Sequence, residues 1–260
     1  MWLWPGEALY VGPSLRLDAH SGSVSCLAVG VDEALDVLVD GASSRVLSAF
    51  IPPRLPNRIS SPGRRMAFYF VEPGSARERS CRARMRPATK IHHGHERERE
   101  LAELGRRQAD PNAVRRWVER AAGSGPTTVD DRSREALELL RADPDLSAER
   151  LAAAVHLSTS HFLRLFKRDT GTTLRRYRLW SRMLTVGEHI AGGADLTAAA
   201  TAAGFANPSH FSSAFHAMFG LSPSRLLATP VEICVPTRER PGPVRTASDR
   251  RRSQPGRHHQ

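Results

Sequence analysis

Two stretches of this 260-residue chain match each other without a gap: SHFLRLFKRDTGTT at 160–173 and SHFSSAFHAMFGLS at 209–222. In both, a Ser-His-Phe triplet is followed by a second Phe four residues later and a Gly nine residues after the first Phe. The offset between the copies is 49 residues. An internal repeat of this kind indicates two copies of one supersecondary unit, so the repeat predicts the fold of the C-terminal part.

The first copy has the signals of two short helices joined by a tight turn. Ser147 can cap a helix that runs through residues 151–155, and a turn at 156–158 follows. Ser158 can cap a second helix, from residue 159 to about 169, with Gly171 at its left-handed end. The residues of this second helix that face the core are Phe162, Leu165 and Phe166, at i, i+3 and i+4.

The second copy repeats the plan with different caps. Asp195 or Thr197 can cap its first helix, which is rich in alanine, and residues 204–206 make the turn. Asn207 caps the second helix, and Pro208 stands at its first position, where a missing N–H does no harm. Between the copies, residues 174–190 predict a connecting helix on the order of 25 Å long, which can set two recognition helices one DNA turn apart. Each copy therefore predicts a helix-turn-helix.

Residues 1 to about 90 have the pattern of a small β-sandwich or barrel. Apolar runs at 24–29, 35–39, 46–51 and 66–71 are separated by turn residues at roughly ten-residue spacing. From about residue 95 the pattern changes to two amphipathic helices, 98–107 and 113–122, broken at Asp110-Pro111. A linker rich in Gly, Ser and Thr follows at 122–128, and residues 130–229 are almost wholly helical in pattern.

Composition excludes several classes of protein. The chain has 40% hydrophobic and 25% charged residues, which is typical of a globular protein, and it has no run of 18 apolar residues. Met1 to Tyr10 have no basic segment, so we expect no signal peptide. The three cysteines, Cys26, Cys81 and Cys234, form no CxxC pair, which argues against a disulfide scaffold and fits a cytoplasmic protein.

The net charge of +11 suggests an anionic partner, although an arginine-rich composition can also reflect a GC-rich genome. Residues 1–125 have net charge +5, residues 126–235 only +1, and residues 236–260 again +5. Within the repeat region the charge is local: residues 164–182 hold seven basic side chains and one acidic one. The tail, rich in Pro, Arg, Ser and Gly, is expected to be disordered, either solvated or touching phosphates.

At 130–229 the sequence resembles the two-motif DNA-binding domain of the AraC/XylS transcription regulators. In the first half, the matching residues are Leu151-Ala152, Leu157-Ser158, Phe162, Leu165-Phe166-Lys167, Gly171 and Arg182. In the second half they are Ala200, Gly204-Phe205, Ser209, Phe211, Ala214-Phe215, Phe219-Gly220 and Ser222-Pro223. The resemblance implies a transcription regulator, not an enzyme, that binds double-stranded DNA.

The N-terminal part is similar to the cupin-like sensor half of many such regulators. Residues 51–58 match a common Pro-Pro-x-x-Pro-His turn, with Asn57 in place of the His. The resemblance implies a domain that senses a small-molecule effector or mediates dimerisation. It favours a homodimer, admits RNA polymerase as a further partner, and implies no cofactor and no membrane contact.

The resemblance also implies which side chains touch DNA: exposed residues early in the second helix of each motif. In the first motif these are Thr159, Ser160, Leu163, Arg164, Lys167 and Arg168. In the second they are Pro208, Ser209, Ser212, Ser213 and His216. Arg164 can pair with guanine O6 and N7, and Leu163 can contact a thymine methyl group. Because the second helix is poor in basic residues, we predict that the first motif anchors and reads while the second follows backbone and shape.

Three other hypotheses compete with a sensor-regulator. A metal-dependent cupin enzyme needs histidine ligands, but His20 stands alone, and the cluster His92-His93-x-His95 has the pattern of an exposed linker. A DNA-repair alkyltransferase fused to such a domain needs a reactive cysteine, for which Cys81 among several arginines is the candidate. In the third hypothesis the N-terminal domain senses no effector and serves for dimerisation alone, through helices at 96–122.

The sequence therefore predicts an α+β chain with no catalytic or metal residues and no assignable effector site. We expect a cupin-like β-barrel at 1–90, helices and a linker at 91–129, and a double helix-turn-helix domain at 130–229. A disordered basic tail is expected at 230–260.

Overall fold

The computed structural model describes residues 1–107, 110–123 and 131–236. Its N-terminal part is built from two antiparallel sheets with strand orders β1-β2-β8-β3-β6-β9 and β5-β4-β7. The strands are β1 (Trp2–Trp4), β2 (Glu7–Pro13), β3 (Ser25–Gly30), β4 (Leu35–Val39), β5 (Ala42–Val46), β6 (Ser48–Ile51), β7 (Arg58–Ser60), β8 (Arg65–Val71) and β9 (His92–His93). The four apolar runs of the sequence correspond to β3, β4, β6 and β8.

The central strand β3 is buried on both faces, which explains its unbroken apolar sequence. Leu27 and Val29 point to one face and pack with residues of the helices that follow the sheet. Cys26 and Ala28 point to the opposite face, into the space between the two sheets. Successive side chains of a strand alternate between faces, so one strand serves two cores.

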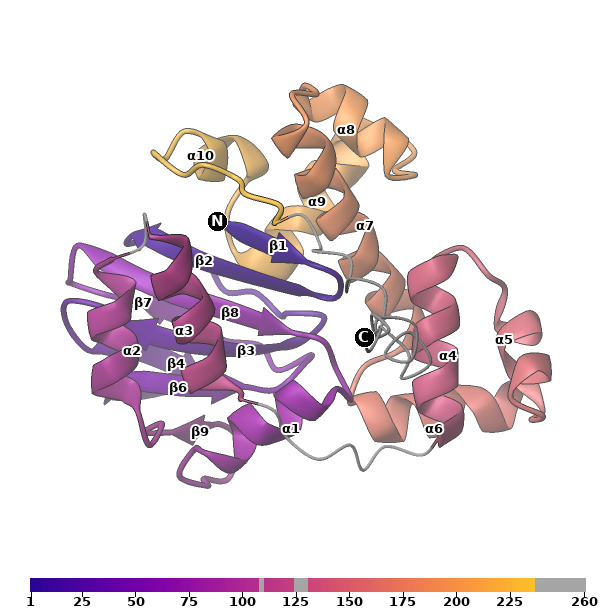
Figure 1. Cartoon of the computed structure of the whole chain (residues 1–260), viewed down its shortest axis with the longest axis horizontal. Coiled ribbons are helices and arrows are strands. Elements are labelled where there is room, and N and C mark those ends of the chain that lie inside the picture. Colours follow the sequence, from indigo (N-terminus) through magenta and orange to yellow (C-terminus); the bar gives the residue numbers. More distant parts are fainter. Residues whose placement is uncertain (108–109, 124–130, 237–260) are drawn as a thin grey trace, which may run out of the picture.

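The described residues of the N-terminal part form three helices: α1 (Ala76–Ala83), α2 (Glu98–Gly105) and α3 (Pro111–Ala121). Trp117 of α3 is buried, and its Nε1 donates to the carbonyl oxygen of Leu101 on α2 at 2.9 Å. Asp110 caps α3 and Pro111 begins it, so the break predicted at Asp110-Pro111 is the start of a helix. Figure 1 shows α2 and α3 together over one face of the sheet.

Helix α1 differs from the expectation of β-structure up to about residue 90. Ser75 caps it by accepting a hydrogen bond from the backbone N–H of Glu78, and Cys81 is its buried residue. Its sequence, ARERSCRA, is mostly charged. A short helix with so few apolar positions gives little periodic signal, because its stability depends mainly on tertiary contacts.

The C-terminal part is helical, as predicted. Its helices are α4 (Asp131–Ala142), α5 (Ala148–Ala154), α6 (Thr159–Thr170), α7 (Leu174–Ala191), α8 (Leu196–Ala202), α9 (Pro208–Phe219) and α10 (Pro223–Leu227). Ser147, Ser158 and Asn207 cap α5, α6 and α9, and of the two candidates for α8 the cap is Asp195. Figure 1 shows the first copy, α5 and α6, and the second, α8 and α9, towards opposite ends of α7.

The chain returns to the barrel after α10. Leu3 N–H donates to the carbonyl oxygen of Cys234 at 2.9 Å, and Cys234 N–H donates to that of Met1 at 2.8 Å. Val231 and Ile233 pack against buried apolar clusters. Residues up to 236 thus belong to the folded part, which corrects the expectation of a disordered tail from residue 230. The rest of that predicted tail, and most of the predicted linker at 122–128, lie outside the described residues.

Candidate DNA interface and interdomain cavity

Helix α6 presents a polar face to solvent because its apolar residues are buried behind it. Phe162 and Phe166 are buried against Tyr177 of α7 and the residues of α4 and α5. Phe166 and Tyr177 stack edge to face with their ring centres 5.8 Å apart. The opposite face exposes Ser160, Leu163, Arg164, Lys167 and Arg168, whereas Thr159 is half-buried. The structure thus gathers the predicted contact residues of the first motif on one surface.

The basic side chains near α6 are not all available to a phosphate. Arg168 pairs with Asp169 at 2.7 Å, Arg182 pairs with Asp145 at 2.9 Å, and Arg178 donates to the carbonyl oxygen of Leu146. Arg164 and Lys167 form no ion pair with a carboxylate among the described residues. These two are therefore the strongest basic contributors to the exposed face.

Leu163 is unusual because 40% of this large apolar side chain is exposed on the helix face that also carries Arg164. An exposed leucine has a cost in water that a partner can remove. A thymine methyl group offers such an apolar contact in the major groove.

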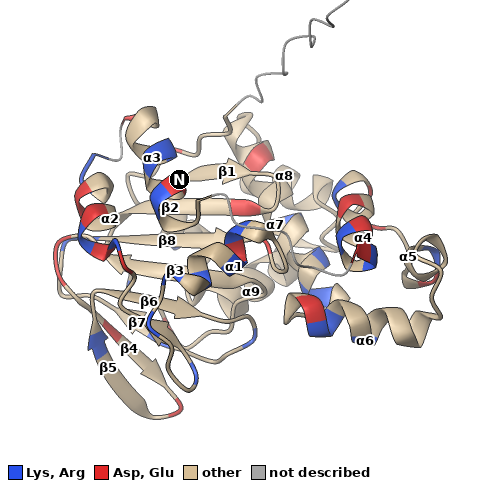
Figure 2. Cartoon of the chain, turned by 60° about the horizontal axis from the view of Figure 1, so that its bottom comes forward, with Lys and Arg blue, Asp and Glu red and all other residues tan. Residues whose placement is uncertain are grey.

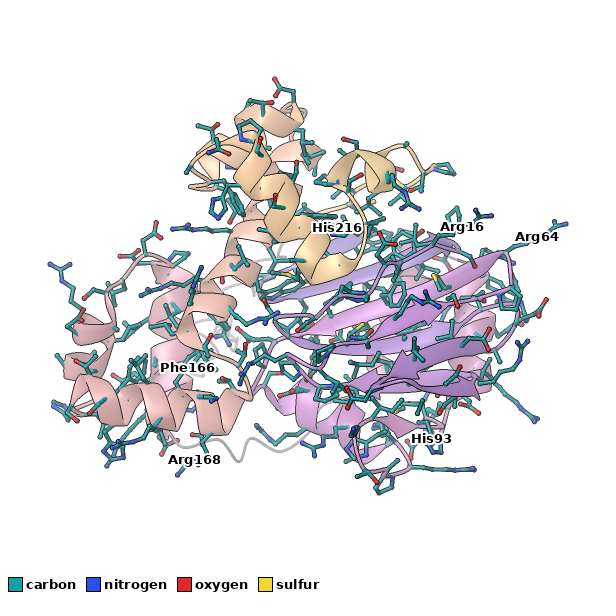
Figure 3. The ribbon with its side chains drawn as sticks, turned by 180° about the vertical axis from the view of Figure 1, so that it is seen from behind. Arg16, Arg64, His93, Phe166, Arg168 and His216 are labelled. Atoms are coloured by element: carbon teal, nitrogen blue, oxygen red, sulfur yellow. The ribbon has the colours of Figure 1, made fainter. Side chains whose placement is uncertain are left out.

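In the second motif, the structure separates the predicted contact residues into two groups. Pro208, Ser209 and Ser213 are exposed in the first half of α9, and Ser212 is half-buried. His216, in the second half, has its Nε2 3.0 Å from Oδ2 of Asp18, which belongs to the barrel. Figure 3 shows His216 over the barrel, far from Arg168 on α6. The row of predicted contact residues on α9 therefore ends against a barrel carboxylate.

The last turn of α9 is attached to the barrel by main chain and side chains. Ser21 N–H donates to the carbonyl oxygen of Ala217 at 3.1 Å, and Asp18 N–H donates to that of Gly220 at 2.7 Å. Leu221 is buried in the cluster that fills the space between the two sheets, and Phe215 and Phe219 pack against it. The second motif thus closes the interior of the barrel.

A cavity of about 110 Å³ lies between the barrel and the second motif. Apolar side chains from both sides line it. They include Tyr10, Leu15, Cys26, Ile59, Phe68 and Phe70 from the barrel, and Trp180, Met183, Phe215, Met218 and Phe219 from α7 and α9. Neither lysine nor arginine is among its lining residues within the part of the chain that the structure describes.

Two polar side chains border this cavity. Asn57 is 5% exposed; its Nδ2 donates to the carbonyl oxygen of Leu55 at 2.9 Å, while its Oδ1 has no hydrogen-bond partner in the described part. His20 pairs with Asn57 through the main chain, and burial lowers the pKa of its imidazole. An unpaired buried oxygen costs about 1–3 kcal/mol, so a hydrogen-bond donor at this point would stabilise the protein.

The first motif meets the barrel through polar contacts instead. Glu72, at the end of β8, is buried and accepts hydrogen bonds from Arg141 Nε of α4 and from Tyr177 Oη of α7, both at 2.8 Å. Burial, followed by the charge of Glu72, raises the pKa of Tyr177. Trp180 Nε1 of α7 donates to the carbonyl oxygen of Gly6 at 3.1 Å.

His95 and Cys81, candidates in the two enzyme hypotheses, are both buried. His95 is buried, with Nε2 3.0 Å from the carbonyl oxygen of Ala121 and Nδ1 accepting from the N–H of Arg97 at 3.1 Å. Over residues 1–107, 110–123 and 131–236, no three His, Cys, Asp or Glu side chains come together as a metal site. Cys81 is fully buried, which raises the pKa of its thiol and disfavours the thiolate that an alkyl acceptor requires.

Comparison with known proteins agrees with this geometry. Residues 151–229 match a family model described as a helix-turn-helix domain. The chain is similar to apo ToxT from Vibrio cholerae strain SCE256, a single-residue variant, with a TM-score of 0.57 and 13% identity, covering 87% of this chain and 98% of that one. It is also similar to unsaturated fatty acid bound wild-type ToxT from the same strain, with a TM-score of 0.55 and 12% identity, covering 86% and 95%. At such identities the likeness concerns the fold.

The fold and the matched domain define the class: this chain is a DNA-binding transcription regulator with an α+β fold. More narrowly, its C-terminal part is an AraC-type double helix-turn-helix domain, and the antiparallel sheets of its N-terminal part fit the predicted cupin-like fold. Both conclusions confirm the sequence predictions. None of the described helices is both long and apolar enough to cross a membrane.

Sequence reasoning missed the residues that join the second motif to the barrel. Asp18 gave no signal, because an isolated aspartate in a loop has many roles. Met218, Phe219 and Leu221 did carry a signal: they occupy the positions of Asp169, Thr170 and Thr172 in the first copy. An apolar replacement at three nearby sites of a repeat indicates a second buried surface.

Proposed function

We propose that this regulator reads DNA mainly through α6, and that a small apolar molecule in the interdomain cavity controls the position of α9. One observation carries the proposal: the second motif closes the barrel interior with its own aromatic side chains, Phe215 and Phe219, and leaves a cavity at the junction. A ligand bound there would touch both domains at once. Binding that differs between two arrangements shifts their populations.

For DNA reading, we propose Arg164 as the main base contact and Leu163 as an apolar contact beside it. Ser160 and Lys167 lie on the same exposed face, and Thr159 and Arg168 flank it at positions suited to phosphates. In α9 we propose Pro208, Ser209, Ser212 and Ser213 as weaker contacts that follow backbone and shape. His216 is proposed to contact DNA only when it leaves Asp18, because the pair at 3.0 Å occupies its Nε2.

The lining of the cavity suggests the class of ligand. Its walls are apolar, and a carboxylate would find no cationic side chain among the described lining residues. The unpaired Oδ1 of Asn57 favours a hydrogen-bond donor. ToxT has been solved with an unsaturated fatty acid bound. For the present chain we propose an uncharged, mainly apolar molecule with one hydroxyl or amide donor.

The size of the cavity suggests how the ligand acts. A volume of about 110 Å³ is below the ~300–1,000 Å³ of ordinary ligand pockets. We propose that a ligand larger than this space pushes α9 and the barrel apart. Because α9 carries part of the DNA surface, the ligand would change the spacing of the two recognition helices and so the affinity for DNA.

A cavity-filling variant tests this proposal. Cys26→Met adds volume to the cavity wall, whereas Cys234→Met makes the same change outside the cavity. We expect decanol to alter the affinity of the wild-type chain and of Cys234→Met for a selected DNA duplex by more than threefold, and to leave Cys26→Met unaffected. Decanoic acid should act more weakly than decanol, because neither a lysine nor an arginine is among the described lining residues to pair with its carboxylate. Equal responses of both variants, measured by fluorescence anisotropy, would refute the cavity as the effector site.

A homodimer and contacts with RNA polymerase are further parts of the proposal. The apolar residues of α3 are buried against the sheet and α2, and its outer face exposes Arg115, Arg116, Glu119 and Arg120. A dimer that used this helix would thus rest on charged contacts and weaken as salt is added.

A further inference from the structure

The C-terminal end of α6 meets a turn of the barrel that carries an arginine. Ser160, Arg164, Lys167 and Gly171 follow one another at spacings of four, three and four residues, so the reading face of α6 ends at Gly171. A β-carbon on Gly171 would lie 3.6 Å from Cγ of Pro53, in the turn between β6 and β7. The residue after Pro53 is Arg54, which is exposed. The barrel therefore reaches the surface that we propose to face DNA.

Arg54 lies beside a second arginine, Arg176 in the first turn of α7. The carbonyl oxygen of Gly22 accepts from Arg54 N–H at 2.9 Å and from Arg176 Nη2 at 3.4 Å. Arg176 Nη2 also donates to Ser21 Oγ at 3.2 Å. Burial, together with the neighbouring charge of Arg54, lowers the pKa of Arg176. The main chain of Arg54, from the barrel, and the guanidinium of Arg176, from α7, thus share one acceptor.

Within the described residues, this pair of like charges lacks a compensating carboxylate. Neither Arg54 nor Arg176 forms an ion pair with a carboxylate within the described ranges, and Arg176 Nε is buried there without a hydrogen-bond partner. Arg54 also adopts a left-handed backbone conformation, with φ +67°, which non-glycine residues rarely do. Strained residues of this kind gather at functional sites. Figure 2 shows basic residues at the end of α6 nearest the barrel.

We propose that Arg54 of the barrel and Arg176 of α7 together bind one phosphate of the DNA backbone, at the end of the α6 reading face. Guanidinium groups suit phosphate because their N–H donors match its oxygens in a fork. A recognition helix in the major groove has backbone phosphates beyond both of its ends. The N-terminal domain then takes part in DNA binding directly, and not only through its hold on the second motif. The proposal rests on the proposed use of α6 for DNA reading.

The phosphate would also couple the two domains. It would relieve the repulsion between the two guanidinium groups only while the barrel turn stays against α6. DNA would therefore favour the docked arrangement of barrel and first motif, and any change that separates them would weaken DNA binding by the same factor.

The test is Arg54→Asn in the full chain, with Arg64→Asn as the matched control. Asparagine tolerates the left-handed conformation better than most residues, so the turn should fold. Arg64 is another exposed barrel arginine, and Figure 3 shows it far from α6. The probes are a duplex that the wild-type chain selects from a randomised pool and an unrelated duplex of the same length. Affinities for both are measured from about 50 to 300 mM salt.

We expect Arg54→Asn to weaken binding to both duplexes about three- to tenfold. The plot of the logarithm of the binding constant against the logarithm of salt concentration should become less steep by about 1, since one phosphate contact is lost. Sequence preference should not change. Arg64→Asn should keep the wild-type slope. Equal slopes for the two variants, at equal melting temperatures, would overturn the proposal.

A further arm separates DNA phosphate from a free anion. If inorganic phosphate stabilises the wild-type chain but not Arg54→Asn, while both keep the same slope with DNA, the site binds a free anion and the DNA contact is refuted. A wild-type chain that selects no duplex at all would instead refute the proposed DNA reading by α6, which is a different result from equal slopes.

Discussion

The two helix-turn-helix copies share a plan but differ where their second helices end. In the first copy the end of α6 carries Asp169, Thr170 and Thr172; in the second the matching positions are Met218, Phe219 and Leu221. The apolar core of the first copy is completed by α4 and α7, which belong to the same domain. That of the second copy is shared with the barrel, into which Leu221 is buried.

The contrast teaches that a repeated motif can divide two tasks between its copies. The first copy keeps exposed basic residues, and the helices that flank it, α4 and α7, meet the barrel through polar groups around Glu72. The second has few charges and meets the barrel through aromatic side chains. Apolar burial is worth about 25 cal/mol per Å², so the second copy is the one whose position the barrel controls most strongly. Three predictions would sharpen or break this division.

The largest effect is expected at the glycines that end α6 and α9. Both are left-handed, with φ +68° at Gly171 and +75° at Gly220. A β-carbon on Gly220 would lie 2.5 Å from the carbonyl oxygen of Asp18, whereas one on Gly171 meets only Pro53 at an ordinary distance. We expect Gly220→Ala to lower the free energy of unfolding by about 2–4 kcal/mol, from strain and overpacking together. Gly171→Ala should cost only about 1–2 kcal/mol, for strain alone.

Urea denaturation of the two variants at one temperature measures this difference. Equal losses in the free energy of unfolding would mean that the junction of α9 with the barrel rearranges to accept the added methyl group. The second copy would then not be held against the barrel as closely as the structure shows.

A smaller difference is expected for DNA affinity. Arg164→Ala should weaken binding to a selected duplex by about 1–3 kcal/mol and relax the preference at one base pair, because a two-pronged contact with guanine is lost. Ser213→Ala, at the matching position of α9, should change affinity less than threefold. Both side chains are exposed, so neither change should alter stability. A larger loss for Ser213→Ala, in titrations at fixed salt, would reverse the assignment of the two copies.

The smallest effect concerns pH. Burial lowers the pKa of His20 from its ordinary 6.5, and Asp18 and His216 face it at the α9 junction. The folded chain therefore prefers the neutral imidazole. The stability that the neutral His20 imidazole contributes is complete above pH 6.5. As the pH falls below that value this stability is lost, and the free energy of unfolding drops by at most about 1.4 kcal/mol per pH unit.

His20→Gln should thus lose less stability than the wild-type chain between pH 6.5 and 5. His95, whose pKa burial also lowers, is present in both proteins and cancels in the comparison. Parallel pH profiles in urea denaturation would show that His20 stays hydrated or charged in the folded state.

Much of the C-terminal fold was predictable because its signals are local. Ser158, Asn207 and the glycines at 171 and 220 specify helix ends through bonds that span a few residues. The barrel was predictable only in part. The apolar strands β3, β4, β6 and β8 gave a signal, but β1 and β2, which begin the chain, did not, and α1 was missed for lack of an apolar stripe. The domain boundaries predicted at residues 90 and 129 stay predictions, whereas the chain predicted to be disordered from residue 230 lies against β1 at Cys234.

The sequence by itself determined that two helix-turn-helix units follow a β-rich domain, and which helix face of each unit is polar. These features depend on caps, periodicity and a repeat, all of which act over short stretches of chain. Only the tertiary structure decided that α9 closes the barrel, that Asp18 holds His216, and that Arg54 stands beside Arg176. Such contacts join residues more than 100 positions apart, and they arise from the shapes of two assembled domains, which no short-range pattern encodes.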